Sequence, residues 1–363
     1  MSYFIEYYNY CDKFVKLSSY IGERFDLVQA GGGNTSFKFN DIMYIKSSGC
    51  NLSDIHPNKN CVGVNYKNIK NNLIDTNFDN IDKKDRENKS KYIVDQSIYF
   101  LKQYKPSIET TLHTLTKTFT VHIHPIQFNL ISALPNCEKI LNNLFQKCCI
   151  IEYFTPGIDV TIELFKKYNN ENIIFLKNHG VVFSSDTVEE MYSLINDTMN
   201  KLEKLCNINL NKYKFVNEIS NIMTNLYNTQ FVTYLSEDVV INNFLKYKLF
   251  NNNIINNESL DDNIIKPFFP DKFVYCGTSI VLLNDNIELS INEYEKKYNE
   301  IPIIFITKSL NIYISSHNIK KCYEIESVLK SHLICCNIDN ILLDNTEINY
   351  LSSWDAEKYR KCV

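Results

Sequence analysis

Residues 119–124 have the sequence Phe-Thr-Val-His-Ile-His, and this stretch carries the clearest signal for the fold. Phe119, Val121 and Ile123 are apolar and alternate with polar residues. Successive side chains of a β-strand point to opposite faces, so this alternation indicates a half-buried strand. We therefore expect a strand whose apolar face packs on the core and whose other face carries His122 and His124.

Two histidines at positions i and i+2 of a strand can bind one metal ion, because their imidazoles point the same way. His179 follows a second apolar strand, expected at residues 173–176, and precedes Gly180. Three histidines that leave coordination positions open are typical of a catalytic rather than a structural zinc site. The spacing alone is also compatible with histidines on a solvent-exposed face or in a loop.

Glu109 lies on a helix that is expected to begin near Ser107, directly after Pro106. A carboxylate beside a metal ion can act as a general base or as a temporary ligand. The alternative is an ordinary glutamate in the first turn of a helix, where the helix dipole favours a negative charge. His113 lies one turn later, and we interpret it as a structural histidine.

Two turns rich in small residues, at residues 31–36 and 46–49, are candidate anion-binding sites. Backbone N–H groups of such turns can converge on phosphate oxygens, and a helix start adds a hydroxyl and a dipole. The residues with this potential are Gly33, Asn34, Ser48, Gly49 and Ser107, with Lys46 as a source of positive charge. Flexible hairpin loops and a helix N-cap are the alternatives, and neither turn matches a nucleotide-binding motif.

The composition argues against two classes of partner. The 363 residues carry a formal net charge of -4, so no basic excess is present to neutralise a nucleic-acid backbone. No apolar run is long enough to span a membrane, and the N-terminus lacks the features of a secretory signal. The 12 cysteines include no CxxC pair, and we expect reduced thiols in a cytoplasmic protein.

The pattern of apolar residues predicts several further elements. Residues 1–25 are expected to form an amphipathic helix, and residues 36–39 and 42–45 a β-hairpin. The polar and charged stretch of about residues 67–91 is predicted to be a surface loop or an insertion. Strand and helix patterns after residue 266 predict a small α/β unit, preceded by an Asn-rich linker.

Five motifs occur in an order that resembles the class II aldolase/adducin family. They are Gly-Gly-Gly-Asn-Thr-Ser (31–36), Lys-Ser-Ser-Gly (46–49), Pro-Ser-Ile-Glu-Thr-Thr-Leu-His (106–113), Val-His-Ile-His-Pro (121–125) and Leu-Lys-Asn-His-Gly-Val-Val (176–182). The closest similarity is to the aldolase part of rhamnulose-1-phosphate aldolase/dehydrogenase fusion proteins. The segment Phe269–Tyr275 and the late segment Tyr350–Trp354 resemble the region that follows the aldolase in those fusions.

The resemblance implies an α/β fold with αβα layers and a largely antiparallel central sheet. We predict that residues 1–210 form this class II aldolase/adducin-like domain. Residues 211–265 are predicted to be a helical connection and Asn-rich linker, and residues 266–363 a second, smaller α/β domain.

The resemblance also assigns roles to the candidate site residues. It implies a divalent metal ion, usually Zn²⁺, held by His122, His124 and His179, and it places Glu109 at the catalytic acid/base. Gly33, Asn34, Ser48, Gly49 and Ser107 fall where the family binds substrate phosphate. Several sugar-phosphate members carry Ser-Ser-Glu where this chain has Ser107-Ile108-Glu109, so one hydroxyl contact to phosphate is missing.

The activity that the resemblance implies is that of a metal-dependent sugar-phosphate aldolase, a carbon–carbon lyase of carbohydrate metabolism. Such an enzyme cleaves a ketose 1-phosphate by a retro-aldol reaction through a metal-stabilised enediolate. The expected assembly is a homo-oligomer, commonly a tetramer.

Three other activities remain open on the same scaffold. Sugar-phosphate dehydratases and epimerases share it, and adducin-like heads are non-catalytic interaction modules. Glu109 favours an aldolase or dehydratase over an epimerase. The three histidines favour an enzyme over an interaction module.

Overall fold

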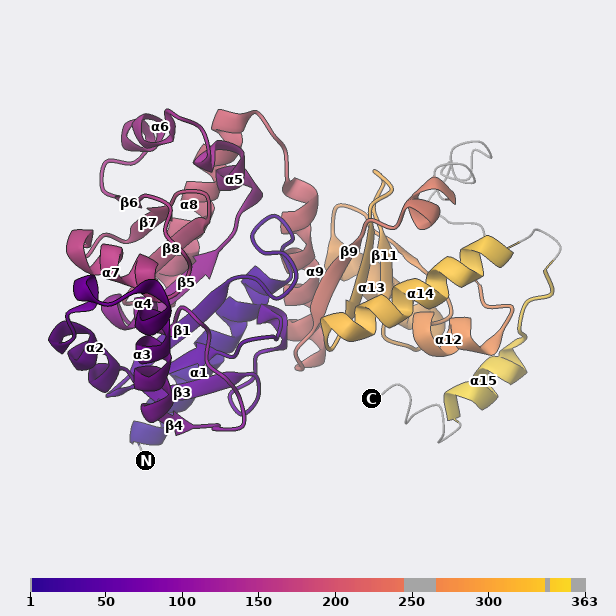
Figure 1. The fold of residues 1–363 in the computed structure, drawn as a ribbon. Helices are drawn as coiled ribbons and strands as arrows, with labels where there is room; N and C mark the ends of the chain where they lie inside the picture. The colour runs from indigo at the N-terminus through magenta and orange to yellow at the C-terminus, as the bar shows by residue number, and fades with distance from the viewer. Residues whose placement is uncertain (1, 245–265, 337–339, 354–363) are drawn as a thin grey trace. The chain divides into compact units, whose positions relative to one another are not determined.

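The computed structural model of the chain describes residues 2–244, 266–336 and 340–353 (Figure 1). The chain divides into two units, Met1–Leu210 and Asn211–Val363. No described helix combines the length and the apolar composition that crossing a membrane requires.

The first unit is built on an eight-stranded sheet with the strand order β4-β3-β2-β1-β5-β8-β7-β6. Its strands are β1 (Asn34–Phe39), β2 (Ile42–Lys46), β3 (Cys61–Asn65), β4 (Ile98–Phe100), β5 (Phe119–Ile123), β6 (Cys149–Ile151), β7 (Ile173–Leu176) and β8 (Gly180–Ser185). All neighbouring strands are antiparallel except β6 and β7. The predicted α/β fold with a largely antiparallel central sheet is therefore confirmed.

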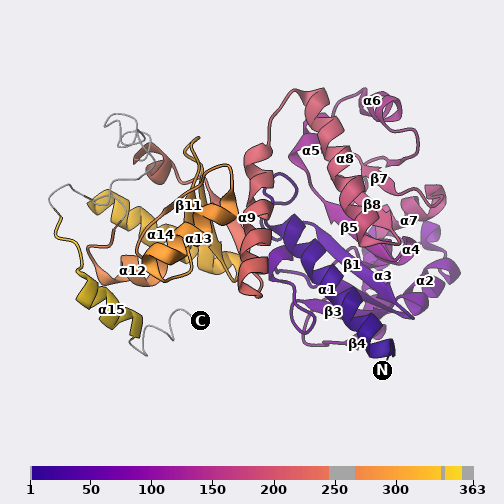
Figure 2. The ribbon, with the colours of Figure 1, turned by 180° about the vertical axis from the view of Figure 1, so that it is seen from behind.

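Helices cover both faces of this sheet. They are α1 (Ser2–Gly22), α2 (Tyr66–Asp75), α3 (Lys83–Gln96), α4 (Thr110–Leu115), α5 (Ile126–Ser132), α6 (Cys137–Leu144), α7 (Ile158–Lys167) and α8 (Val188–Cys206), with short 3₁₀ turns at Leu52–Asp54 and Phe78–Asn80. In Figure 1, α2, α3, α4 and α7 lie in front of the sheet, and Figure 2 shows α1 and α8 in front of its other face. The arrangement gives the three αβα layers.

The central strand β5 follows the alternation in its sequence. Phe119, Val121 and Ile123 are buried in the core that α1 and α8 share with one face of the sheet. His122 is also fully buried, but it belongs to the opposite, polar face of the strand. His124 lies just past the end of β5.

The prediction of a surface loop at residues 67–91 is wrong, because most of this stretch is helical. The α2 helix is capped by Asn65, whose side chain accepts from the Asn68 backbone N–H at 3.0 Å. Asp82 caps α3 in the same way through the Asp85 N–H, also at 3.0 Å. Only Ile69 of α2 is buried, and α3 buries three residues. The apolar stripe is therefore too narrow to stand out against the charged residues in the sequence.

The helix expected to begin near Ser107 begins later, at Thr110. Ser107 and Glu109 therefore precede the helix instead of lying in its first turn. The Thr110 backbone N–H and its hydroxyl both donate to the Ser107 carbonyl, at 3.1 and 2.6 Å. This local turn holds Glu109 at the N-terminal boundary of α4.

The second unit contains a smaller, four-stranded sheet with the strand order β10-β11-β12-β9. Its strands are β9 (Val232–Ser236), β10 (Val281–Leu282), β11 (Ile304–Ile306) and β12 (Ile312–Ser316), and its helices are α9 (Asn211–Tyr227), α12 (Pro270–Cys276), α13 (Ile287–Tyr298), α14 (Ile319–Cys335) and α15 (Asn345–Ser353). The presence of a second, smaller α/β part is confirmed.

The segment predicted as a connection, residues 211–265, contributes a strand to this second sheet. Antiparallel pairing of β9 with β12 buries Val232 and Ile314 in one core. Most of the Asn-rich linker lies outside the described residues.

Candidate metal centre

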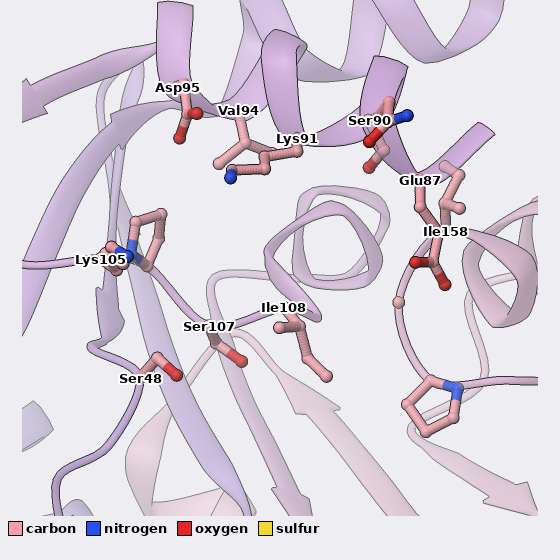
Figure 3. A pocket seen from close by; sticks show the side chains of 14 residues that line it. Ser48, Glu87, Ser90, Lys91, Val94, Asp95, Lys105, Ser107, Ile108 and Ile158 are labelled. Atoms are coloured by element: carbon pink, nitrogen blue, oxygen red, sulfur yellow. The ribbon is translucent and has the colours of Figure 1, made fainter. Parts of the chain in front are cut away.

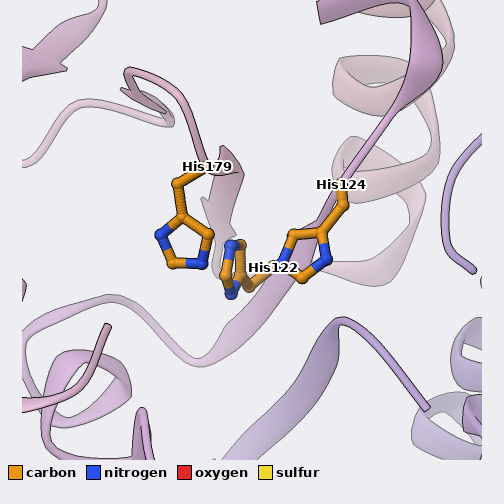
Figure 4. Close-up of side chains that lie close together, drawn as sticks. All are labelled: His122, His124 and His179. Carbon is orange, nitrogen blue, oxygen red and sulfur yellow. The ribbon is translucent and has the colours of Figure 1, made fainter. Parts of the chain in front are cut away.

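Three histidines from two neighbouring parts of the central sheet come together (Figure 4). His122 lies on β5, His124 just beyond its end, and His179 in the turn between β7 and β8. One nitrogen from each imidazole can be chosen so that all three lie within 4.8 Å of one another. The sequence-predicted histidine set is therefore assembled in space.

Strand pairing explains why these residues meet although they are far apart in the sequence. In the β5–β8 register, His122 is opposite Val182, and Ile123 is opposite Val181. Gly180 permits the close approach, because a Cβ there would lie 2.3 Å from the Ile123 carbonyl oxygen and 2.9 Å from His122 Nε2. Any larger residue at Gly180 would push β8 and His179 away from β5.

Glu109 lies against the histidine cluster and is 3% exposed. His122 Nδ1 donates to Glu109 Oε2 at 2.5 Å, and the Asn34 side-chain amide donates to the same oxygen at 2.7 Å. The other carboxylate oxygen, Oε1, lies 3.4 Å from His179 Nε2. The structure thus brings together all four residues that the sequence marked for metal binding and acid/base chemistry.

A chain of hydrogen bonds continues from Glu109 into the core. Asn34 Oδ1 is hydrogen-bonded to His113 Nε2, and His113 Nδ1 lies 2.7 Å from the Ser36 hydroxyl. Because the Asn34 amide nitrogen donates to Glu109, its oxygen must accept from His113 Nε2–H. His113 Nδ1 then accepts from Ser36, so His113 is neutral and buried, as a structural histidine would be.

Sequence analysis did not identify the contact between Asn34 and Glu109. Asn34 is opposite His122 in the β1–β5 register, and Asn34 and Ser36 are two residues apart on one strand. The period of two that identified the histidine face of β5 would have placed Asn34 and Ser36 on one face of β1.

The protonation states of these residues suit a metal site. Burial, helped by the neighbouring His122 and His179, lowers the pKa of His124 to about 3. Burial and His122 lower the pKa of His179 to about 4. Both imidazoles are therefore neutral at pH 7, which is the form that binds metal.

The pKa of Glu109 reflects two opposing effects. Burial by itself raises it, but His122, His179 and the hydrogen bond from Asn34 together lower it below its usual range. Glu109 is therefore ionised, and its negative charge faces the histidines.

Unpaired nitrogen atoms indicate that the site can accept a cation. His122 Nε2 and His124 Nε2 are buried and have no hydrogen-bond partner among the described residues. His122 donates through Nδ1 to Glu109, which leaves a lone pair on Nε2. Buried polar atoms without partners are costly, so imidazole nitrogens that lie within 4.8 Å of one another fit a divalent metal ion such as Zn²⁺.

The candidate phosphate-binding residues adjoin this cluster, and a short antiparallel bridge joins two of the segments. Ser47 pairs with Pro106, the Ser48 N–H donates to the Lys105 carbonyl at 2.8 Å, and the Ser107 N–H donates to the Lys46 carbonyl at 3.2 Å. The backbone N–H groups of Ser48 and Ser107 are therefore already used. The Ser107 hydroxyl accepts from the Glu109 N–H at 3.3 Å, so it can still donate its own proton to a ligand, as can the Ser48 hydroxyl.

Two other residues of the small-residue turns have structural roles. Gly33 has a φ of +69°, and a Cβ there would lie 2.8 Å from the His122 carbonyl oxygen. Lys46 is 3% exposed and donates to the carbonyls of Gly31, at 3.1 Å, and Ser47, at 3.3 Å. The Lys46 ammonium thus ties the two turns together. Gly49 is exposed, with a φ of +81°.

Comparison with known proteins gives one family match. The family model described as the class II aldolase and adducin N-terminal domain matches residues 13–210, so the match ends where the first unit ends. No protein of curated function is similar enough in sequence to count as a match.

Several solved structures are similar to part of the chain. The N-terminal class II aldolase domain of a conserved protein from Thermoplasma acidophilum is 23% identical, with a TM-score of 0.47, over 54% of this chain and 93% of that one. An L-fuculose 1-phosphate aldolase is 15% identical (TM-score 0.40; 54% and 84% covered). A sugar-phosphate aldolase from Thermotoga maritima is 12% identical (TM-score 0.38; 55% and 95% covered).

Proposed function

The chain belongs to the class II aldolase and adducin family, and from that premise we propose that it is a metal-dependent sugar-phosphate aldolase. The proposed reaction is retro-aldol cleavage of a ketose 1-phosphate into a three-carbon ketose phosphate and an aldehyde. The observation that carries the proposal is the convergence of three histidines on an ionised, buried Glu109. An interaction module has no need for such a costly group of buried polar side chains.

His122, His124 and His179 would hold the metal ion, which we expect to be Zn²⁺. When bound, the ion would stabilise the negative charge that develops on the substrate as the carbon–carbon bond breaks. The remaining chemistry is assigned to side chains of this protein.

Glu109 is proposed to move the proton. Retro-aldol cleavage requires a base that takes the proton of the hydroxyl next to the breaking bond, and a proton must later return to carbon. Glu109 is ionised and fixed by two hydrogen bonds, so it is prepared to act first as the base. Asn34 and His122 orient its carboxylate.

The substrate phosphate is proposed to bind beside Gly33, Asn34, Ser48, Gly49 and Ser107. Ser48 and Ser107 would contribute hydroxyl hydrogen bonds. Asn34 is already engaged by Glu109 and His113, so we assign it chiefly to positioning the acid/base. The family further suggests a cytoplasmic homo-oligomer, with a tetramer as the first assembly to test.

Metal analysis of the purified full-length protein tests the proposal first. We expect one divalent ion per site, and we expect its loss in the double variant His122→Ala/His124→Ala. The matched control removes two exposed histidines, His56→Ala/His317→Ala, and should retain the metal. Well-folded protein that binds no metal even after metal is added back would overturn the enzyme proposal in favour of an adducin-like interaction module.

Cleavage assays on a panel of ketose 1-phosphates test the reaction. Glu109→Gln should retain the metal and lower the turnover number by at least about 100-fold, the usual scale for loss of a general base. Metal-loaded protein that cleaves none of the panel would redirect the proposal to a dehydratase or an epimerase. Undiminished turnover in Glu109→Gln would remove the proposed role of Glu109.

A further inference from the structure

A cavity of about 490 Å³ opens beside the proposed phosphate-binding residues (Figure 3). Its lining includes Ser48 and Ser107 on one side and residues of α3 on the other. Its volume lies in the range of small-molecule sites. Ser107 also accepts from the Glu109 backbone N–H at 3.3 Å, so the cavity adjoins the segment that carries the proposed acid/base.

The α3 wall of this cavity is held in a fixed position. Arg86 on α3 donates through Nε to Asp159 of α7 at 2.9 Å, and through Nη1 to the Ile81 carbonyl at 3.0 Å. Ser90 and Val94 of α3 are buried, while Lys91 between them is exposed. The anchored helix thus carries Lys91 into the lining of the cavity, as Figure 3 shows.

Lys105 supplies a second ammonium group on the side of Ser48. Its carbonyl accepts from the Ser48 N–H at 2.8 Å, so its backbone is fixed next to that serine. Neither Lys91 nor Lys105 forms an ion pair with a charged group in the described part of the chain. Both charges are therefore available to a ligand, and neither lysine belongs to the five motifs.

Two acidic residues also line the cavity, and their positions show where an anion would bind. In Figure 3, Glu87 lies beside Ile158, on the opposite side from Ser48, whereas Asp95, one helical turn beyond Lys91, lies on the same side as Lys105. The two ammonium groups of Lys91 and Lys105 outnumber the one carboxylate of Asp95 at this end of the cavity, where the hydroxyls of Ser48 and Ser107 can still donate. A dianion is favoured at that end and disfavoured next to Glu87.

We propose that Lys91 and Lys105 bind the phosphate group of the substrate, together with the hydroxyls of Ser48 and Ser107. The inference rests on the proposed function for the identity of the substrate, but it names two residues that the family pattern does not. Ile108 occupies the position where sugar-phosphate relatives carry a second serine, and it is 70% exposed. The two ammonium groups replace that missing hydroxyl and make the site selective for a doubly charged phosphate.

Calorimetric titration with inorganic phosphate tests this inference without any need for turnover. The full-length protein is titrated in the presence of a chelator, so that phosphate bound to a metal ion does not contribute. Lys91→Gln and Lys105→Gln should each weaken phosphate binding about fivefold, and the double variant more than tenfold, as expected for charge-assisted contacts of partly exposed groups. Lys89→Gln, an exposed lysine of α3 outside the cavity lining, should change it less than about twofold.

The outcomes separate this inference from the proposed function. Phosphate binding that depends on both lysines supports the inference even if no sugar phosphate is cleaved, in which case only the aldolase proposal fails. Phosphate binding that is unchanged in the double variant, or that cannot be detected in the folded wild-type protein, overturns the inference. Where cleavage is observed, the double variant should raise KM for the phosphorylated substrate more than it lowers kcat.

Discussion

Removal of the Asn34 amide should weaken both catalysis and stability. Asn34 is 5% exposed, donates to Glu109 at 2.7 Å and accepts from His113. In Asn34→Ala, Glu109 keeps only the hydrogen bond from His122, and the His113 Nε2–H faces a space with no acceptor. The variant therefore removes a hydrogen bond from Glu109, the proposed acid/base, and leaves all three proposed metal ligands in place.

The magnitude follows from these two losses. A hydrogen bond to a charged acceptor contributes about 1.5–3 kcal/mol, and a buried donor left without a partner costs about 1–3 kcal/mol. Solvent can relieve part of the cost, so we expect the free energy of unfolding to fall by about 3 kcal/mol. A shift of Glu109 by about 1 Å would lower the turnover number about 100-fold.

A second variant determines whether His113 acts through Asn34. In His113→Phe, the ring volume is kept, but Asn34 Oδ1 and the Ser36 hydroxyl lose their partner. If His113 only holds Asn34, the double variant should lose no more turnover than Asn34→Ala alone, because coupled residues give non-additive effects. The pH dependence of the residual rate should shift in both single variants in the same direction.

The assay combines initial cleavage rates, metal content and urea unfolding of the full-length protein. Asn72→Ala, an exposed asparagine of α2, serves as the control and should leave all three unchanged. Unchanged turnover in a well-folded, metal-loaded Asn34→Ala variant would refute the positioning role of Asn34. Additive losses in the double variant would show that His113 acts independently of Asn34.

Two further predictions concern stability. Asp26→Asn should lower the free energy of unfolding by about 3 kcal/mol in urea titrations, because Arg24, 1% exposed and bonded to Asp26 at 2.6 Å, would become an uncompensated buried charge. Burial lowers the pKa of Lys272 to about 8 from its usual 10.5, although Cys276 and Glu300 oppose the shift. Between pH 8 and 10.5 the unfolded state binds more protons at this lysine than the folded state does. The free energy of unfolding should therefore rise with pH over this range, by up to about 3 kcal/mol. Lys272→Met should abolish this rise, and a wild-type-minus-variant difference that is constant from pH 6 to 10 would contradict the prediction.

The fold class was predicted from the resemblance to a family, whereas the prediction of β5 and of its two faces rests on short-range periodicity. The alternation in residues 119–124 determines which face of β5 packs on the core and which carries His122. The two-residue period fixes side-chain direction in any strand, so it needs no knowledge of the neighbouring strands. The prediction that His179 lies near His122 and His124 was weaker, because it depends on the long-range pairing of β8 with β5.

The features that the sequence did not reveal depend on tertiary packing. The α3 helix escaped prediction because only Ser90, Ile93 and Val94 of its residues are buried, and the rest are polar or charged. Asn34 was predicted as a phosphate ligand because glycine-rich turns bind anions in many folds. Its contact with Glu109 joins residues 75 positions apart, and no local pattern encodes such a distance.

The hydrogen bonds of Glu109 also explain why a single substitution can separate metal binding from catalysis. Glu109 Oε2 accepts from both Asn34 and His122 Nδ1, and this second bond fixes His122 as the tautomer whose Nε2 lone pair is free. A glutamine at this position can present its carbonyl oxygen to the same two donors, so His122 keeps its tautomer and its orientation. What the glutamine cannot do is accept a proton. Glu109→Gln should therefore leave the metal affinity within about tenfold of wild type while turnover collapses, whereas Glu109→Ala should weaken both because His122 loses its partner.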